Sequence, residues 1–192
     1  MVEMIANTIV NQMEEEKFLS REMKEHYIYA LITMIEKWIT VISVFCISIF
    51  FEQIVPMGIF LAFFLTLRKR TGGFHANSFW QCYLGTVFIS IAIIFICPIL
   101  TNHMSIVYSL LICSIIFISI IGTVNHPNMA MDCFELQESK KAARNLLGLK
   151  CMILLSAITL DINKIYICYM SMAIILCAIL LCLAKIIKQE VC

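Results

Sequence analysis

The longest uncharged segment of the chain sets the main constraint on its fold. From Thr71 to Met131 the sequence contains no Asp, Glu, Lys or Arg. Of all 192 residues, 61% are hydrophobic and only 14% are charged, against about 45–50% and about 25% in ordinary soluble domains. A soluble domain of this size could not bury so long an uncharged segment. The sequence therefore excludes a soluble enzyme and indicates an integral membrane protein.

The membrane environment also selects the type of secondary structure. A helix crosses a hydrocarbon core about 30 Å thick with about 20 apolar residues, and it satisfies its own backbone hydrogen bonds. The strands of a membrane barrel would alternate apolar and polar residues over about ten positions, and the sequence shows no such alternation. We expect an all-α, polytopic membrane protein in which residues 1–192 form a single domain.

The overall charge and the cysteines exclude two further classes. The 14 Lys and Arg residues nearly balance the 13 Asp and Glu residues, so the chain lacks the strongly basic surface that nucleic acids require. Most of the ten cysteines lie inside apolar segments, where they act as small hydrophobic residues rather than as a disulfide framework. We expect no nucleic-acid partner and no cofactor.

The first 26 residues predict an amphipathic helix that precedes the transmembrane bundle of residues 27–192. Its apolar positions recur at helical spacing: Val2, Ile5, Ala6, Ile9, Val10 and Met13. Glutamates are interspersed with the basic residues of this segment, which is not the pattern of a cleavable signal peptide. The helix is expected either to lie on the membrane surface or to pack on the bundle.

Six apolar segments predict the transmembrane spans. They cover about residues 27–51, 53–67, 83–100, 104–124, 146–160 and 165–184. The second is short, because fifteen residues make a helix of only about 22 Å. We expect it to thin the bilayer or to extend into its flanking residues.

The basic residues predict how the chain is oriented in the membrane. Basic residues of short loops favour the cytoplasmic side, and twelve of the fourteen fit one arrangement of six spans. In this arrangement both termini are cytoplasmic, and so are the loops after the second and fourth spans. We predict a multi-pass protein of the cell membrane.

The residues that could carry chemistry are concentrated in the segment 68–82. It contains three basic residues, a glycine pair, a histidine and a cysteine: Arg68, Lys69, Arg70, Gly72, Gly73, His75 and Cys82. A cysteine beside a histidine can form the thiolate–imidazolium pair that makes sulfur nucleophilic at neutral pH. His75 and Cys82 are therefore candidate catalytic residues.

The spacing of His75 and Cys82 places a condition on this hypothesis. Positions seven apart on a straight helix differ by about 10.5 Å in height, well beyond the hydrogen-bond distance that a nucleophile and its base need. Gly72 and Gly73 would supply the backbone freedom for a bend. We therefore predict a re-entrant or interfacial element that the surrounding spans shield from lipid.

Other polar groups leave alternatives open. A second pair, His126 and Cys133, has the same spacing, and the two pairs together could hold zinc, although zinc sites usually use closer pairs. Glu36, Lys37 and Glu52 lie in or beside the first span and could line the polar path of a small carrier or channel. Snorkelling toward the membrane surface is the simpler explanation for these three charges.

The stretch from Arg70 to Cys82 resembles the accessory gene regulator protein B family, the membrane cysteine endopeptidases that process quorum-sensing propeptides in Gram-positive bacteria. The chain length and the polytopic layout are similar. The motif Gly72-Gly73-Phe74-His75-Ala76, followed after six residues by Cys82, carries the resemblance. It favours the first His–Cys pair over the second, because a proline follows His126.

The resemblance implies a bacterial peptidase with Cys82 as nucleophile and His75 as base. Its partner would be a short precursor peptide with an amphipathic N-terminal helix and an acidic C-terminal tail. Cys82 would form a thioester, which a cysteine or serine of the substrate attacks to close a thiolactone or lactone ring. The basic residues near the site would either bind the acidic tail or only set the topology: Arg68, Lys69, Arg70, Lys140, Lys141 and Arg144. The sequence leaves open whether two copies pair as a homodimer.

Overall fold

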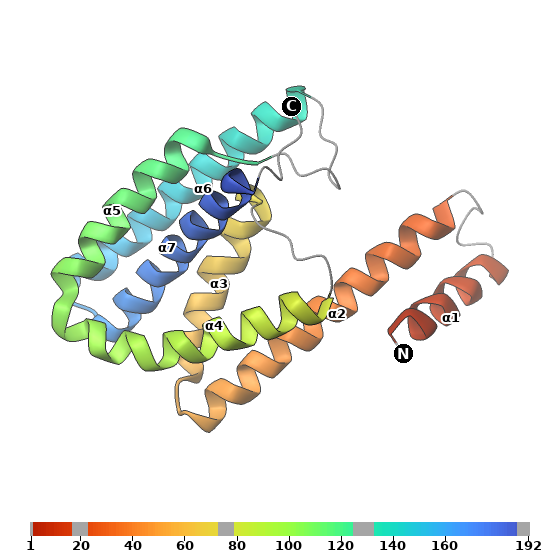
Figure 1. Cartoon of the computed structure of the whole chain (residues 1–192), viewed down its shortest axis with the longest axis horizontal. Coiled ribbons are helices and arrows are strands. Elements are labelled where there is room, and N and C mark those ends of the chain that lie inside the picture. The colour runs from red at the N-terminus through yellow and green to blue at the C-terminus, as the bar shows by residue number, and fades with distance from the viewer. Residues whose placement is uncertain (1, 17–22, 73–78, 125–132, 188–192) are drawn as a thin grey trace.

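The protein is described by a computed structural model that covers residues 2–16, 23–72, 79–124 and 133–187. Within these ranges every regular element is a helix. In chain order the helices are α1 (Val2–Glu15), α2 (Lys24–Phe50), α3 (Ile54–Thr71), α4 (Phe79–Leu100), the short 3₁₀ helix η2 (Thr101–His103), α5 (Met104–Ile121), α6 (Cys133–Thr159) and α7 (Lys164–Ile186) (Figure 1). The all-α prediction is confirmed.

Helices α2 to α7 coincide with the six apolar segments predicted from the sequence, but several boundaries differ. Helix α3 continues to Thr71, so Arg68, Lys69 and Arg70 form its last turn rather than a loop. Helix α6 begins at Cys133, thirteen residues before the predicted span. Residues 133–145 contain no Gly or Pro, and a polar helix can extend beyond the apolar segment without a break.

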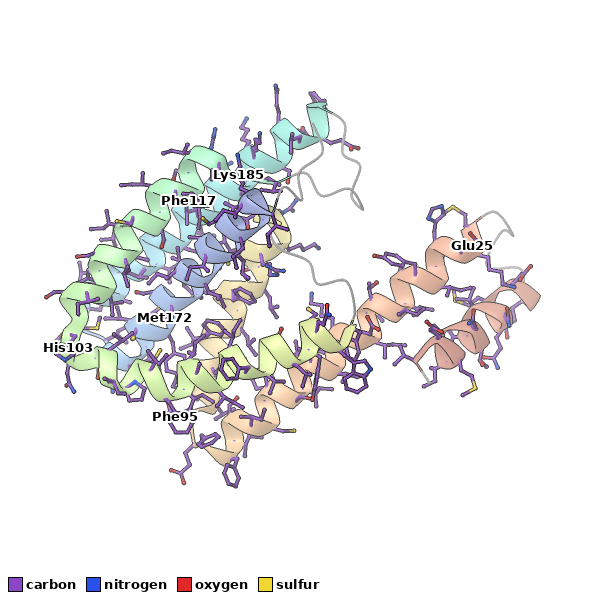
Figure 2. The ribbon with its side chains drawn as sticks, in the orientation of Figure 1. Glu25, Phe95, His103, Phe117, Met172 and Lys185 are labelled. Atoms are coloured by element: carbon purple, nitrogen blue, oxygen red, sulfur yellow. The ribbon has the colours of Figure 1, made fainter. Side chains whose placement is uncertain are left out.

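By length and composition, four helical segments are able to cross a membrane. They are α2, the continuous stretch Phe79–Ile121 that contains α4 and α5, the segment Phe134–Thr159 of α6, and α7. Figure 2 shows His103 at the bend where α4 passes into α5. Helix α3 does not meet this description, since its 18 residues include three basic ones.

Helix α7 lies at the centre of the bundle and contacts α3, α4, α5 and α6. Its buried positions include many small side chains, which let neighbouring helices approach closely: Cys168, Ser171, Ala173, Cys177, Ala178 and Ala184. Between them Tyr169, Ile174 and Leu181 are fully buried. In Figure 1 the helix is enclosed by its neighbours, with α5 and α6 on one side and α3 on the other.

The N-terminal amphipathic helix is confirmed as α1, and it packs along α2. Its apolar face includes Ala6 and Val10, both of them fully buried. The ammonium of Lys24 at the start of α2 forms an ion pair with Glu14 (Nζ to Oε2, 2.6 Å). Helix α2 begins three residues before the predicted boundary at residue 27.

The outer surface of the bundle is strongly apolar. Large side chains on α2, α4 and α5 are largely exposed, among them Phe50, Phe88, Ile116 and Ile120. Figure 2 shows Phe95 on the outer side of α4, where 56% of its surface is exposed. So extensive an exposed apolar surface is unfavourable in water and suits contact with lipid. The outer surface therefore agrees with a membrane protein.

Candidate active site

Helix α3 ends at a glycine that its conformation requires. Gly72 has φ +66°, and its backbone N–H donates to the carbonyl of Arg68 (2.9 Å). Only glycine adopts such a conformation readily. A Cβ atom at this position would also lie 3.1 Å from the carbonyl oxygen of Val124. Gly72 thus ends the helix and lets a neighbouring segment approach closely.

Three hydrogen bonds join the ends of α3, α5 and α6. The N–H of Val124, just after α5, donates to the carbonyl of Thr71 (3.2 Å). The hydroxyl of Thr123 donates to the carbonyl of Arg70 (2.9 Å), and the hydroxyl of Ser139 on α6 donates to the same oxygen (3.3 Å). We call these contacts the three-helix junction. Because of it, the chain enters residues 73–78 and residues 125–132 from adjacent points.

The end of α5 is held by two residues of α6. Gly122 has φ +75°, and a Cβ atom there would lie 3.0 Å from Cγ of Lys140. The guanidinium of Arg144 donates from Nε to the carbonyl of Ser119 (2.9 Å) and from Nη2 to that of Ile120 (3.4 Å). These carbonyls belong to the last turn of α5, which has no partners of its own for them. Arg144 therefore satisfies the end of a helix, a role that the sequence analysis missed.

Cys82 is an exposed free cysteine in the first turn of α4. In the same turn of α4, the rings of Phe79, Trp80 and Tyr83 contact one another at centroid distances of 5.5–6.0 Å. The hydroxyl of Tyr83 donates to Oγ of Ser43 on α2 (3.1 Å). The start of α4 is thus fixed against α2 and presents an accessible thiol.

His75 and Gly73 lie outside the described residues, as does His126. The predicted pairing of His75 with Cys82, and the predicted re-entrant or interfacial element, therefore remain predictions. The C-terminal part of the segment 68–82 is regular helix, because α4 begins at Phe79 and Cys82 is its fourth residue. Cys133 is the first residue of α6.

The predicted basic residues lie at the end of the bundle where the three-helix junction is found. Arg68 is partly enclosed: its Nη1 is buried, and its guanidinium lies over the ring of Phe64 (5.8 Å). Lys69, Arg70 and Lys141 are exposed. Figure 2 places Lys185 at the same end.

The alternative sites receive little support from the described residues. No group of three or more His, Cys, Asp or Glu side chains in the described ranges could hold a metal ion, and the zinc hypothesis depends on His75 and His126, which lie outside them. Glu36 is half-buried on α2, whereas Lys37 on α2 and Glu52 in the turn after it are exposed. Sixteen residues separate Glu36 from Glu52, about 24 Å along a helix. Among the described residues, no ion pair joins Lys37 to either glutamate.

Comparison with known proteins gives a consistent result. The family model described as Accessory gene regulator B matches residues 3–183. A protein of Clostridium perfringens (strain SM101 / Type A) named as AgrB-like is 34% identical over 96 residues, which are 50% of this chain and 45% of that protein. A second AgrB-like protein, from strain 13 / Type A, is 33% identical over the same shares.

The chain thus matches about half the length of these curated relatives. No solved structure matches it. The family model, however, covers nearly the whole chain and includes the segment with Gly72 and Cys82. This membrane protein belongs to the accessory gene regulator B family.

Proposed function

We propose that this protein is a membrane-embedded cysteine endopeptidase that cleaves a short quorum-sensing propeptide and promotes its cyclisation. Membership of the accessory gene regulator B family supports a peptide-processing role. The observation that carries the proposal is the exposed free thiol of Cys82 at the start of α4. It follows the Gly72-Gly73-Phe74-His75-Ala76 motif at the spacing expected for that family.

In the proposed reaction the Cys82 thiolate attacks the peptide carbonyl at the junction with the C-terminal tail. A carbon–sulfur bond forms, the carbon–nitrogen bond breaks, and the imidazolium of His75 gives its proton to the departing amine. A cysteine or serine of the substrate then attacks the thioester. The ring closes as a thiolactone or lactone, and the Cys82 thiol is released. Water must be excluded during this step, because hydrolysis would compete with ring closure.

The proposed substrate is a short peptide with an acidic C-terminal tail. Exposed basic residues near the three-helix junction support this part of the proposal. Lys69 and Arg70 at the end of α3 and Lys141 on α6 are exposed. The three-helix junction ties the end of α3 to α6, so these charges belong to one end of the molecule. A cluster of cations attracts an acidic peptide and orients it as it arrives.

The test is to co-express the chain with its candidate precursor peptide and to follow the cleaved product by mass spectrometry. Cys82→Ala and His75→Ala are expected to abolish cleavage at unchanged membrane levels. Cys113→Ala is the matched control, because Cys113 is also an exposed free cysteine but lies on α5. The wild type should accumulate a fragment bound through a thioester that hydroxylamine releases. Cleavage by Cys82→Ala would refute the proposal.

A further inference from the structure

The charged residue that is best buried in the described chain is a lysine in the middle of the bundle. Lys150 on α6 is only 6% exposed, and the other buried polar residues in the described ranges are all serines and threonines. It occupies the centre of a helical stripe whose other buried members are Ala143, Leu147, Leu154 and Ala157. A lysine at this position faces protein rather than lipid, so it cannot snorkel to the membrane surface.

The described contacts of Lys150 include an aromatic ring but no acid. Its ammonium lies 4.2 Å from the ring centre of Phe63 on α3. Arg68, one turn further along α3, has a buried Nη1 atom. Cys177 on α7 lies beside the same part of α3, since its thiol donates to the carbonyl of Phe64 (3.8 Å). No ion pair links Lys150 to an acidic residue in the described ranges.

A buried lysine without an acidic partner lowers the stability of the folded protein. Removing an ammonium from water costs several kcal/mol, whereas a cation–π contact returns only about 0.5–2 kcal/mol. Ionisable residues inside membrane bundles are rare for this reason, and they commonly mark a binding site or a pathway. The missing component at Lys150 is a negative charge.

The described contacts place this region beside the last turns of α3. Lys150 lies over the ring of Phe63. Arg68 lies over the ring of the next residue, Phe64, whose carbonyl accepts a hydrogen bond from the thiol of Cys177. Helices α3, α6 and α7 carry these residues, and all three pack against one another (Figure 1). An anion that binds near Lys150 would therefore lie close to the part of α3 that carries Arg68.

We propose that Lys150, together with Arg68, is an internal anion-binding site that receives a carboxylate of the peptide substrate between α3, α6 and α7. The identity of the occupant rests on the proposed peptidase function, whereas the anion site itself does not. The inner position favours a carboxylate on a narrow peptide over a lipid phosphate, because Lys150 faces the protein interior and headgroups remain outside the bundle. Binding would supply the negative charge that Lys150 lacks.

The first measurement is the thermal unfolding of the full chain in phosphatidylcholine nanodiscs without peptide. Lys150→Met is expected to raise Tm, because it replaces an uncompensated buried charge with an apolar side chain of similar length. Lys164→Met, a matched change at the exposed start of α7, should leave Tm unchanged. A fall in Tm for Lys150→Met would overturn the proposal, since Lys150 would then be stabilising the structure without any ligand.

The second measurement adds a peptide probe in two forms that differ only in charge. Acetyl-Ala-Glu-Ala-amide should raise Tm of the wild type, of Lys150→Arg and of Lys164→Met, but not of Lys150→Met. Acetyl-Ala-Gln-Ala-amide should raise none of them. Equal responses of the wild type and Lys150→Met would overturn the proposal. So would a wild type that does not distinguish the two probes.

A third measurement separates the two sources of negative charge. Replacing phosphatidylcholine by phosphatidylglycerol should change Tm of the wild type and Lys150→Met equally. A shift that depends on Lys150 would assign the site to a lipid headgroup and overturn the carboxylate proposal. Because none of these measurements requires cleavage, failure of the anion site and failure of the peptidase function are distinguishable.

Discussion

The backbone N–H of Val124 donates a hydrogen bond to the carbonyl oxygen of Thr71 at 3.2 Å. This contact joins two positions that lie 53 residues apart, one at the end of α3 and the other just after α5. The segments that follow them contain the two His–Cys pairs singled out from the sequence. The three-helix junction therefore joins the end of α3 to the end of α5, and the first prediction tests how much Gly72 contributes to it.

Gly72→Ala should destabilise the protein by about 1–3 kcal/mol, because alanine strongly disfavours φ +66° and ψ −136°. Its Cβ atom would also press against the carbonyl oxygen of Val124. The measurement is thermal unfolding in detergent. Gly85→Ala on α4 is the matched control, since a Cβ atom there meets nothing within 4 Å, and it should be neutral or slightly stabilising. Equal stability of the two variants would contradict this account of Gly72.

Arg144→Ala should destabilise the protein by about 1 kcal/mol, since it removes the two hydrogen bonds to the last turn of α5. Hydrogen exchange followed by mass spectrometry should show faster exchange in residues 115–124 than in the wild type. Arg144→Lys should destabilise the protein less than Arg144→Ala, because a cation remains near the negative end of the helix. An unchanged exchange rate in this segment would mean that Arg144 does not hold the end of α5.

Lys141→Glu should weaken cleavage of the acidic precursor without changing stability or the amount of protein in the membrane. Lys141 is exposed on α6, whereas its neighbour Lys140 packs over Gly122 and would give a mixed result. The expected effect is a higher KM that becomes smaller as salt increases, because salt screens surface charges. Lys164→Glu at the start of α7 is the control. If Lys141→Glu leaves cleavage unchanged, Lys141 does not bind the acidic tail and contributes only to the orientation of the chain in the membrane.

Glu52→Gly should leave peptide processing unchanged and stabilise the protein by up to about 1 kcal/mol. Glu52 adopts φ +56° in the turn between α2 and α3, a conformation that glycine reaches without the strain of a side chain. The precursor assay measures the first effect and thermal unfolding measures the second. Loss of processing in this variant would contradict the expectation that Glu52 lies outside the candidate active site.

The sequence predicted the helical elements well because apolar length and amphipathic spacing determine them locally. Helices α2 to α7 and the amphipathic α1 all occur near the predicted positions. The extension of α6 to Cys133 was missed, since a polar helix beyond the apolar segment has no hydropathy signal. The glycine at the end of α5 was a visible signal for a helix end, but Arg144 lies 22 residues from Gly122 in sequence.

The candidate site was predicted less completely than the fold. Cys82 is exposed, as a nucleophile must be, while the role of His75 stays a prediction. Lys150 was counted with the residues that set orientation, yet it is buried against Phe63. Hydropathy treats every lysine alike, and only the packing of α6 on α3 and α7 distinguishes a buried lysine from an exposed one. The same limitation applies to the three-helix junction, whose partners are remote in sequence.

The central position of α7 has a consequence for the order of assembly in the cell. Of the described helices this one is synthesised last, and α3, α4, α5 and α6 all contact it. Until it arrives, the earlier helices have inserted without the partner that fills the space between them. Membrane helices can insert separately and associate afterwards, so the tertiary packing of the described bundle awaits the synthesis of α7. A chain interrupted before Lys164 would therefore reach the membrane but could not complete its bundle.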